Sequence, residues 1–526
     1  MEGFEVVLAA VLVSVAVLNA LASRIGIPYP IVLVVGGLAL GLIPGVPEVE
    51  LDPDLVLLVF LPPLLYAAAF FAEPRTLRTY ARALSLSAVG LVLATVALVA
   101  VAAHAALDLP WPMAFALGAI VSPTDPVAAT AIMRRLGAPR QIVNLVEGES
   151  LVNDAAALVT YRFAVAAAIG GAFSLLDASL EFVGAVVGGV ALGLAVGYVV
   201  GEIRRRLEDP ATEITISLIT GYLAFLPADH LHLSGVLAVV TAGLYLGWRA
   251  PELASASTRL QAFAVWDVAT FLLNATLFVL IGLQLPVVVD GLSGQSLAEL
   301  IGDAALVTVT VIGIRCVWMF TTPYLIRALD RRPRQRELRM GTRPRTIIAW
   351  SGMRGAVSLA TALALPLETD AGNALPGREL IVFVTFVVVL VTLVGQGLSL
   401  PWLIRRLGVA GDPREEEHEE LLARLTASKA ALTELETMAD EGWADDETLD
   451  RARGYYEQRK RRFAAQAGKI ADDGSNDDSV RQRVLRRLWQ AERLAVVELR
   501  NTGEISNEVM HRLEHELDLE ESYLDQ

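Results

Sequence analysis

The feature that most constrains this chain is a long succession of apolar stretches, separated by short charged connections. A helix that crosses a lipid bilayer needs about 20 mostly apolar residues, and most of these stretches reach that length. Of the 526 residues, 54% are hydrophobic and 19% are charged, whereas a soluble domain carries roughly a quarter charged residues. We therefore predict an all-α, polytopic membrane protein.

The apolar stretches predict about thirteen membrane-spanning helices. The predicted spans cover, approximately, residues 4–23, 28–45, 53–72, 82–106, 112–134, 141–169, 181–202, 212–227, 231–248, 260–286, 297–328, 345–366 and 378–404. The span over 181–202 repeats glycine at intervals of four. This spacing predicts a helix-packing surface, either within the subunit or between subunits.

The charges of the connections predict how the spans are oriented. Basic residues follow the odd-numbered spans, as in Arg134-Arg135 and Arg204-Arg205-Arg206, whereas the other connections are acidic or neutral. Cytoplasmic loops of membrane proteins carry an excess of lysine and arginine. The N-terminus is therefore predicted outside the cell and the C-terminus in the cytoplasm.

The composition changes abruptly after the last span. We predict a transmembrane domain over residues 1–407 and a cytoplasmic helical region over residues 408–526. The second region is highly charged, and helical periodicity is visible after Glu415-Glu416-Glu417, around 480–499 and over 505–524. A small helical tail is the expected structure.

Two of the spans carry residues that break a helix. Ser122-Pro123-Thr124-Asp125-Pro126 lies in the middle of the fifth span, where two prolines remove amide donors and clash with preceding carbonyls. Ser351-Gly352-Met353-Arg354-Gly355 lies in the twelfth. Unwound backbone at membrane depth is tolerated where it lines a cavity or is buried in protein. Broken helices in matching, oppositely oriented positions point to an inverted-repeat transporter, with spans one to six and eight to thirteen as the repeats.

The sixth span begins with an unusually polar segment, Glu147 to Asp154. Helical spacing places Ser150 one turn before Asp154 and Glu147 a further turn back, while Glu149 and Asn153 form a second pair. Ionisable groups inside a bilayer are costly, so we interpret this segment as a functional site. A buried carboxylate favours its protonated form, and a bound cation favours the ionised form. One carboxylate can thus hold a proton and a cation in turn.

Buried cations are needed to balance these acids. Arg315 and Arg354 are the candidates, and Arg162 lies two turns beyond Asp154. We expect Glu149 to pair with one of these arginines, because an unpaired charge at the bilayer centre is expensive. Asp267 and Asn274 share a face of the tenth span. They are predicted either to form hydrogen bonds between helices or to line a pathway.

These motifs resemble those of the monovalent cation:proton antiporter family, the sodium/proton exchangers, and most closely its bacterial branch. The matching segments are Ser122 to Ala128, Glu147 to Asp154, Trp350 to Leu359, Leu61-Pro62-Pro63-Leu64-Leu65, Asn274 to Phe278, Ile281 to Gln284 and, in the tail, Ile505 to Glu521.

The resemblance implies a role for each matching residue. Asp154 would bind cation and proton alternately, and Asn153 would mark electroneutral exchange of one cation for one proton. Ser150 and the Thr124 carbonyl would complete the ion site, with Asp125 supporting it. Glu149 would pair with Arg315, and Arg354 would balance the helix ends. The family also implies a homodimer that works by alternating access, in a bacterial inner membrane.

The chain departs from the family at one place. Many relatives carry an acid just after the Leu-Pro-Pro segment, where this chain has Ala67-Ala68-Ala69. A ligand or proton role for that acid cannot be transferred, and ion selectivity or pH dependence is expected to differ.

We therefore predict a secondary transporter that exchanges Na⁺, or K⁺ or Li⁺, for protons. A potassium/proton antiporter and a cation channel are the alternatives. An enzyme is not expected, because no nucleophile elbow, phosphate loop or zinc motif is present. The single cysteine, Cys316, offers no disulfide framework. No cofactor and no metal beyond the transported cation are expected, and a net charge of −15 argues against a nucleic-acid partner.

Overall fold

A computed structural model describes residues 2–43, 53–72, 74–170, 175–207, 209–253, 256–284, 288, 296–329, 340–409, 413–441 and 445–471. These residues are helical almost throughout, and their one β-bridge joins Glu368 to Ala374. The all-α prediction is therefore confirmed. The chain forms two compact units, Met1–Gly411 and Asp412–Gln526.

The helices of the first unit follow the apolar pattern of the sequence. They are α1 (Glu2–Ile25), α2 (Tyr29–Gly41), α3 (Pro53–Phe70), α4 (Pro74–Thr79), α5 (Ala81–Ser85), the π-helical turn η1 (Leu86–Leu91), α6 (Val92–Ala106), α7 (Trp111–Val121), α8 (Pro126–Arg135), α9 (Arg140–Gly170), α10 (Leu175–Arg204), α11 (Pro210–His230), α12 (Gly235–Leu253), α13 (Ala256–Leu283), α15 (Leu297–Leu329), α17 (Thr342–Trp350), α18 (Ala356–Leu363), α19 (Arg378–Val391), the π-helical turn η2 (Thr392–Gln396) and α20 (Gly397–Leu407).

Each predicted span corresponds to a helix or to consecutive helices. In the described part of the chain, eight helical segments are long and apolar enough to cross a membrane, with α5–η1–α6, α7–α8 and α19–η2–α20 each counted as one. The four shorter apolar segments lie in α1, α2, α3 and α12. The remaining predicted span is the interrupted pair α17 and α18.

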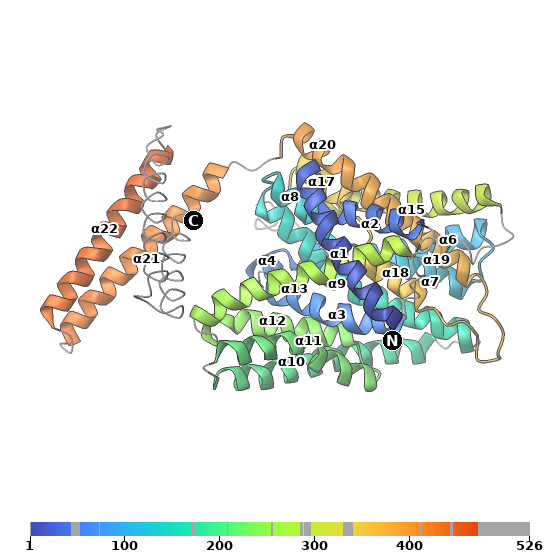
Figure 1. Cartoon of the computed structure of the whole chain (residues 1–526), viewed down its shortest axis with the longest axis horizontal. Coiled ribbons are helices and arrows are strands. Elements are labelled where there is room, and N and C mark those ends of the chain that lie inside the picture. Colours follow the sequence, from blue (N-terminus) through green and yellow to red (C-terminus); the bar gives the residue numbers. More distant parts are fainter. Residues whose placement is uncertain are drawn as a thin grey trace. The chain divides into compact units, whose positions relative to one another are not determined.

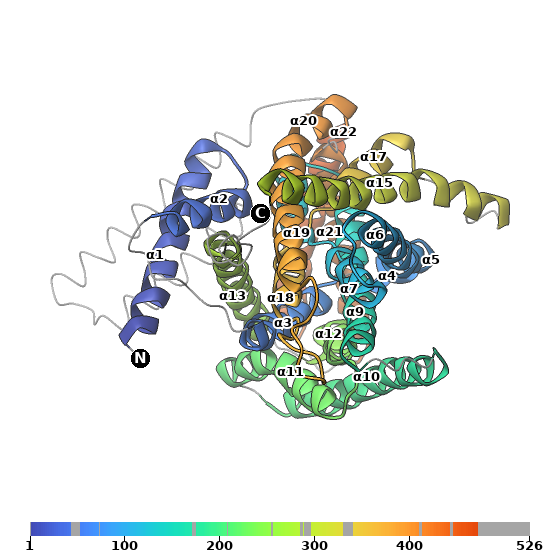
Figure 2. The same ribbon diagram turned by 90° about the vertical axis from the view of Figure 1, so that its right-hand side faces the viewer.

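The helices of the first unit fall into two groups (Figures 1 and 2). We call α1–α3 and α10–α13 the flanking group, in which α13 packs on α2, and α12 packs on α3, α10 and α11. The crossing group comprises α4–α9, α15 and α17–α20, in which α7 packs on α6 and α9, and α15 packs on α6 and α19. A buried apolar cluster joins the groups, because Phe278 of α13 and Met133 of α8 belong to it together.

The glycine-rich face of α10 packs within the subunit. A side chain at Gly189 would come within 2.6 Å of the Ser234 carbonyl oxygen, and one at Gly193 would collide with the Ala238 carbonyl. The absence of side chains thus allows α10 and α12 to approach closely. The part of this face that includes Gly189 and Gly193 therefore packs inside the subunit, as one of the two interpretations predicts.

The second unit contains an antiparallel helical hairpin of α21 (Pro413–Glu441) and α22 (Asp446–Ala471). Leu421, near the start of α21, packs against Phe463, near the end of α22. The helices predicted around 480–499 and 505–524 lie outside the described residues.

Candidate ion-binding site

The fifth predicted span is interrupted between α7 and α8, at Ser122 to Asp125. Pro126 occupies the first position of α8, where its missing amide is not needed. Asp125 is the N-cap of α8, and its side chain accepts a hydrogen bond of 2.9 Å from the Val127 amide. The predicted break is confirmed. The local sequence explains where α8 begins, because Asp125 caps it and Pro126 suits its first position.

A second interruption separates α17 from α18, at Ser351 to Gly355, and it lies directly against the first. The Asp125 amide donates a hydrogen bond of 2.8 Å to the Met353 carbonyl oxygen. A side chain at Gly355 would collide with the Asp125 carboxylate. The two unwound segments therefore cross in contact, and glycine is required at the crossing.

Charged side chains face the helix ends that meet at this crossing. Arg354 is buried and donates to the carbonyl oxygens of Ser122 and, at 2.7 Å, of Pro123, at the end of α7. Arg315 donates to the Ile348 carbonyl oxygen, at 3.1 Å and 3.3 Å, near the end of α17. Helix C-termini carry partial negative charge and N-termini partial positive charge. The two arginines thus balance the C-terminal ends, and Asp125 lies at the N-terminal ends of α8 and α18.

Helix α9 is fastened to the first break by two side chains. The Ser150 hydroxyl donates to the Thr124 carbonyl oxygen at 2.8 Å, and the Asn153 amide donates to the Thr124 hydroxyl at 2.7 Å. Ser150, Asn153 and Thr124 are all buried. The structure therefore brings three of the residues predicted for the ion site into one hydrogen-bonded group.

Asp154, one turn after Ser150, is 9% exposed and borders a large cavity. No ion pair to Asp154 is found within the described residues, and Asp125 is close enough to repel it electrostatically. The cavity has a volume of about 570 Å³ and lies between the crossing group and α3 and α13 of the flanking group. Its polar lining residues are Thr124, Asp125, Thr130, Arg134, Asn144, Glu147, Ser150, Asp154, Asp267, Thr270, Asn274 and Ser358.

The cavity extends to the region where α8 ends and α9 begins. There Arg134 and Glu147 form an ion pair of 2.7 Å, with side chains 65% and 38% exposed. This contact gives a position to Glu147, whose role the sequence does not reveal. Far along α9, Arg162 pairs with Asp229 of α11 at 2.7 Å. Arg162 is thus not a counter-ion of the buried acids, as one sequence-based alternative had it, because its side chain is half exposed and pairs with Asp229 instead.

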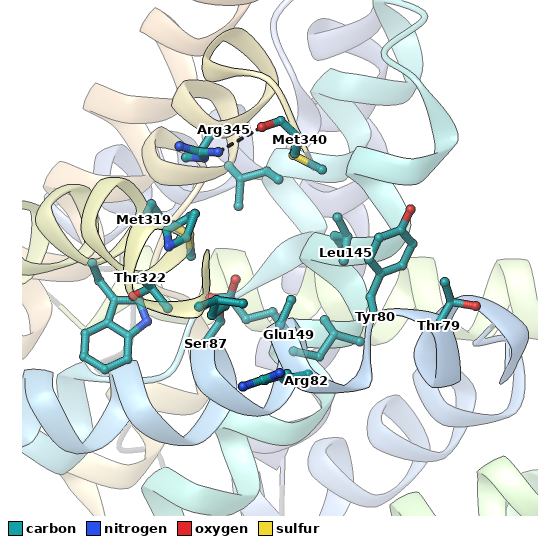
Figure 3. Close-up of a pocket in the computed structure, with 16 residues that line it drawn as sticks. Thr79, Tyr80, Arg82, Ser87, Leu145, Glu149, Met319, Thr322, Met340 and Arg345 are labelled. Carbon is teal, nitrogen blue, oxygen red and sulfur yellow. Dashed lines mark hydrogen bonds between the residues drawn. The ribbon is translucent and has the colours of Figure 1, made fainter. Parts of the chain in front are cut away.

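Glu149 lies on the opposite side of α9 from this cavity. Its carboxylate forms a two-pronged ion pair with Arg315, and both side chains are almost fully buried. Glu149 lines a separate cavity of about 180 Å³, together with residues of α5, η1 and α15 (Figure 3). In the same cavity Arg345 donates to the Met340 carbonyl oxygen at 2.8 Å. Glu149 and Arg315 therefore form a contact between helices, apart from the cavity of Asp154.

Ser358 on α18 is a cavity residue that sequence reasoning did not single out. Its hydroxyl is buried, lines the 570 Å³ cavity and has no hydrogen-bond partner in the described part of the chain. The only signal in the sequence is its position three residues after the Gly352 to Gly355 break. An unpartnered hydroxyl in a cavity that carboxylates also line suits a hard cation, which prefers oxygen ligands.

Comparisons with known proteins agree with this geometry. Residues 8–406 match the family described as "Sodium/hydrogen exchanger, transmembrane". An uncharacterised Na⁺/H⁺ exchanger of Mycobacterium tuberculosis is 38% identical over 99% of this chain and 96% of its own length. A sodium, potassium, lithium and rubidium/H⁺ antiporter of Bacillus subtilis is 32% identical over 77% of this chain and 62% of its own length.

A solved structure shares the fold. The sodium proton antiporter MjNhaP1 of Methanocaldococcus jannaschii superimposes with a TM-score of 0.62, at 18% identity, over 78% of this chain and 99% of its own. The match to the family covers nearly all of the first unit, including both breaks and α9. The chain is a multi-pass membrane protein and belongs to the sodium/hydrogen exchanger family.

Proposed function

We propose that this chain exchanges Na⁺ for H⁺ across the cell membrane and that Asp154 binds the two ions in turn. The observation that carries the proposal is the position of Asp154: a buried carboxylate at the edge of a cavity, with no ion pair in the described residues. Burial favours the neutral acid, and a cation that binds favours the carboxylate. A proton and a cation therefore compete for the same oxygens.

The neighbouring groups adapt this competition to Na⁺. Ser150 and Thr124 place a hydroxyl and a carbonyl oxygen beside Asp154, and both oxygen types are ligands for hard cations. When Na⁺ binds, the proton of Asp154 passes to water in the cavity. When the proton returns, Na⁺ leaves. Each cycle exchanges one positive charge for another, so exchange is electroneutral if Asp154 alone titrates.

Asn153 and Asp125 support the site without exchanging protons. Asn153 adds no charge to it and instead holds the Thr124 hydroxyl. The Asp125 carboxylate accepts the Val127 amide and lies beside Gly355, which ties it to the crossing of the two breaks. Arg354 and the Glu149–Arg315 pair keep the helix ends in place.

Alternating access requires that the cavity open to one side at a time. The cavity reaches the Arg134–Glu147 pair, and the Arg162–Asp229 pair joins α9 to α11 near the other end of α9. The basic connections assign the Arg134 end to the cytoplasm, the N-terminus to the outside and the tail to the inside. We therefore assign this conformation to the inward-facing state. Movement of the crossing group against the flanking group, in a homodimer held by the latter, would expose Asp154 outside.

Potassium/proton exchange is the second candidate, because the Bacillus subtilis relative is named for sodium, potassium, lithium and rubidium. The proposed site contains no feature that excludes the larger ion. The same residues would carry the exchange, so only the order of ion preference would differ.

The test is ion exchange by the purified protein in lipid vesicles. A pH-sensitive dye is enclosed, the membrane potential is clamped at zero, and Na⁺, Li⁺ or K⁺ is added outside. We expect Na⁺ to drive proton movement in wild type and not in the Asp154→Ala variant. A response to K⁺ alone would establish the potassium exchanger. Proton movement that persists without Asp154 would refute the proposed site.

A further inference from the structure

Helix α13 presents an acidic residue to the cavity near the middle of a membrane-spanning segment. Asp267, Thr270 and Asn274 all line the cavity, and their spacing places them on one face of the helix. The membrane-spanning part of α13 covers Thr258–Leu283, so Asp267 is far from either end in sequence. An acid at this depth is costly unless it faces water or an ion, and is therefore a functional candidate.

The partners of this face are limited. Thr270 donates to its own helix, to the Trp266 carbonyl oxygen at 2.7 Å, and Asn274 donates to the Thr270 carbonyl oxygen at 2.9 Å. These contacts leave the side-chain oxygen of Asn274 available as a ligand. For Asp267 the described residues contain no side-chain partner. Within the described part of the chain, these contacts all lie inside α13, so hydrogen bonding between helices, the first interpretation of this face, is not found there.

The described residues of α3 that line the cavity carry no charge. Helices α3 and α13 are adjacent here, because the rings of Tyr66 and Trp266 lie 5.5 Å apart and those of Phe71 and Phe263 lie 5.3 Å apart. On α3, the cavity is lined at this level by Ala67 and Ala68. Among the described residues of the flanking group, Asp267 is thus the acid that lines the cavity.

The other charged groups of the cavity already have assigned contacts. Arg134 and Glu147 pair with each other, and Asp125 caps α8. Asp154 is the exchanging carboxylate of the proposed function. Asp267 lines the same cavity as Asp154 but belongs to the other helix group. A carboxylate in a cleft with low-dielectric walls raises the local concentration of cations.

We propose that Asp267, with the side-chain oxygen of Asn274, forms a second cation station in the cavity, which collects Na⁺ before it reaches Asp154. This inference rests on the proposed function and deepens it. The station acts by charge, on a cation that keeps part of its water. It is not the site of proton exchange. Because Asp267 belongs to the flanking group and Asp154 to the crossing group, movement of the groups separates the two carboxylates.

The test measures the dependence of exchange rate on Na⁺ concentration in vesicles. For Asp267→Asn we expect the KM for Na⁺ to rise about fivefold at low ionic strength, with kcat within about twofold of wild type, because a screened surface-like charge contributes about 1 kcal/mol. The difference should shrink when a large impermeant salt raises the ionic strength, since the Debye length falls. Asp267→Glu should resemble wild type.

Two further variants make the result specific. Asp303→Asn removes an acid of the membrane helix α15 that is not among the residues lining the cavity, and its KM should stay at the wild-type value. Ala68 is exposed and faces the same cavity, so Asp267→Asn combined with Ala68→Asp should recover most of the lost affinity.

An unchanged KM in Asp267→Asn, or a raised KM that does not respond to salt, would overturn the station. A fall in kcat with unchanged KM would do the same, because it would place Asp267 in the conformational change. Failure of wild type to exchange Na⁺ for protons in the same vesicles would instead refute the proposed function. If Asp267→Asn does not fold, Asp267→Glu and the salt dependence of the wild-type KM test the station instead. A station that acts by charge requires the wild-type KM for Na⁺ to rise with salt.

Discussion

Helix α9 carries two buried carboxylates, five residues apart, that differ in nearly everything except burial. Glu149 points away from the large cavity and forms an ion pair with Arg315. Arg315 also donates a hydrogen bond to the Ile348 carbonyl oxygen near the end of α17. Asp154 borders the cavity, and no ion pair to it is found within the described residues. The same chemical group thus fastens three helices in one place and remains available to ions in the other.

The difference teaches that the counter-charge, rather than burial, decides what a membrane carboxylate does. A bidentate arginine satisfies the acid permanently, because arginine does not lose its proton in proteins. A carboxylate without a fixed partner must take its compensation from a proton or a mobile cation. Variants that remove the charge at either position test this difference. At Asp154 we expect transport to change, and at Glu149 we expect stability to change.

The largest effect on transport is expected for Asp154→Asn. The amide has nearly the same shape and cannot ionise, so exchange should fall to the level of protein-free vesicles. The thermal unfolding temperature in detergent should be unchanged or higher, because a neutral group is cheaper to bury. Measuring both quantities on one preparation is essential. A variant that loses exchange together with its folded state would remove the contrast with Glu149.

The largest effect on stability is expected for Glu149→Gln. Removing one partner of a buried ion pair leaves Arg315 uncompensated, which typically costs about 3–5 kcal/mol. The yield of folded protein and the unfolding temperature should both drop sharply.

A double variant is the control for this result. Glu149→Met with Arg315→Met replaces the pair by apolar side chains of similar size, which is often close to neutral for a buried pair. We expect it to recover part of the lost stability, and to exchange Na⁺ measurably once folded. A stable double variant with no exchange would show that Glu149 takes part in transport.

Much of this contrast could be predicted from the sequence, and the reasons are local. Two prolines three residues apart, at 123 and 126, disfavour a continuous helix, so the interruption before Pro126 could be predicted from the residues alone. The Glu149–Arg315 contact followed from resemblance, since spacing left three arginines open. Arg162 illustrates the limit: its distance from Asp154 along α9 says nothing about Asp229, which lies 67 residues away in the sequence and 2.7 Å away in space.

The cavity could not be predicted from the sequence. Its walls come from α3, α8, α9, α13 and α18, and no local pattern states that these helices meet. The periodicity of α13 placed Asp267 and Asn274 on one face and left open what that face touches. Ser358 carries no signal of its own, because a serine in a membrane helix more often bonds to its own backbone.

A smaller effect is expected from the exposed pair Arg162–Asp229, whose side chains are 52% and 51% exposed. Surface pairs contribute about 0–1 kcal/mol. Because this pair joins the two helix groups, Asp229→Asn should favour the conformation in which they separate there. The apparent affinity for outside Na⁺ should rise by up to about fivefold, with unchanged unfolding temperature. The matched control swaps the charges, Arg162→Asp with Asp229→Arg, and should restore the wild-type affinity. If the swap behaves like the single variant, the pair is not a link between the groups.

The smallest effect is expected for Asp209, the carboxylate that precedes α11. Unlike Glu149 and Asp154, it is exposed to solvent. The Thr212 hydroxyl and the Thr212 amide donate to it at 2.6 Å and 2.8 Å, and these bonds hold its pKa below the usual 3.8. A lowered folded-state pKa stabilises the protein above the unfolded-state pKa, and the gain is lost as the pH falls below about 4. Asp209→Ala should therefore lower the unfolding temperature by no more than about 2 °C at pH 7, and by less at pH 3.5. Asp209→Asn keeps a hydrogen-bond acceptor at the start of α11. It should retain most of the stability that Asp209 contributes, and that contribution should no longer depend on pH. A difference that grows on acidification would mean that the carboxylate acts through a partner other than the helix start, since only then would protonation at this position help the wild type.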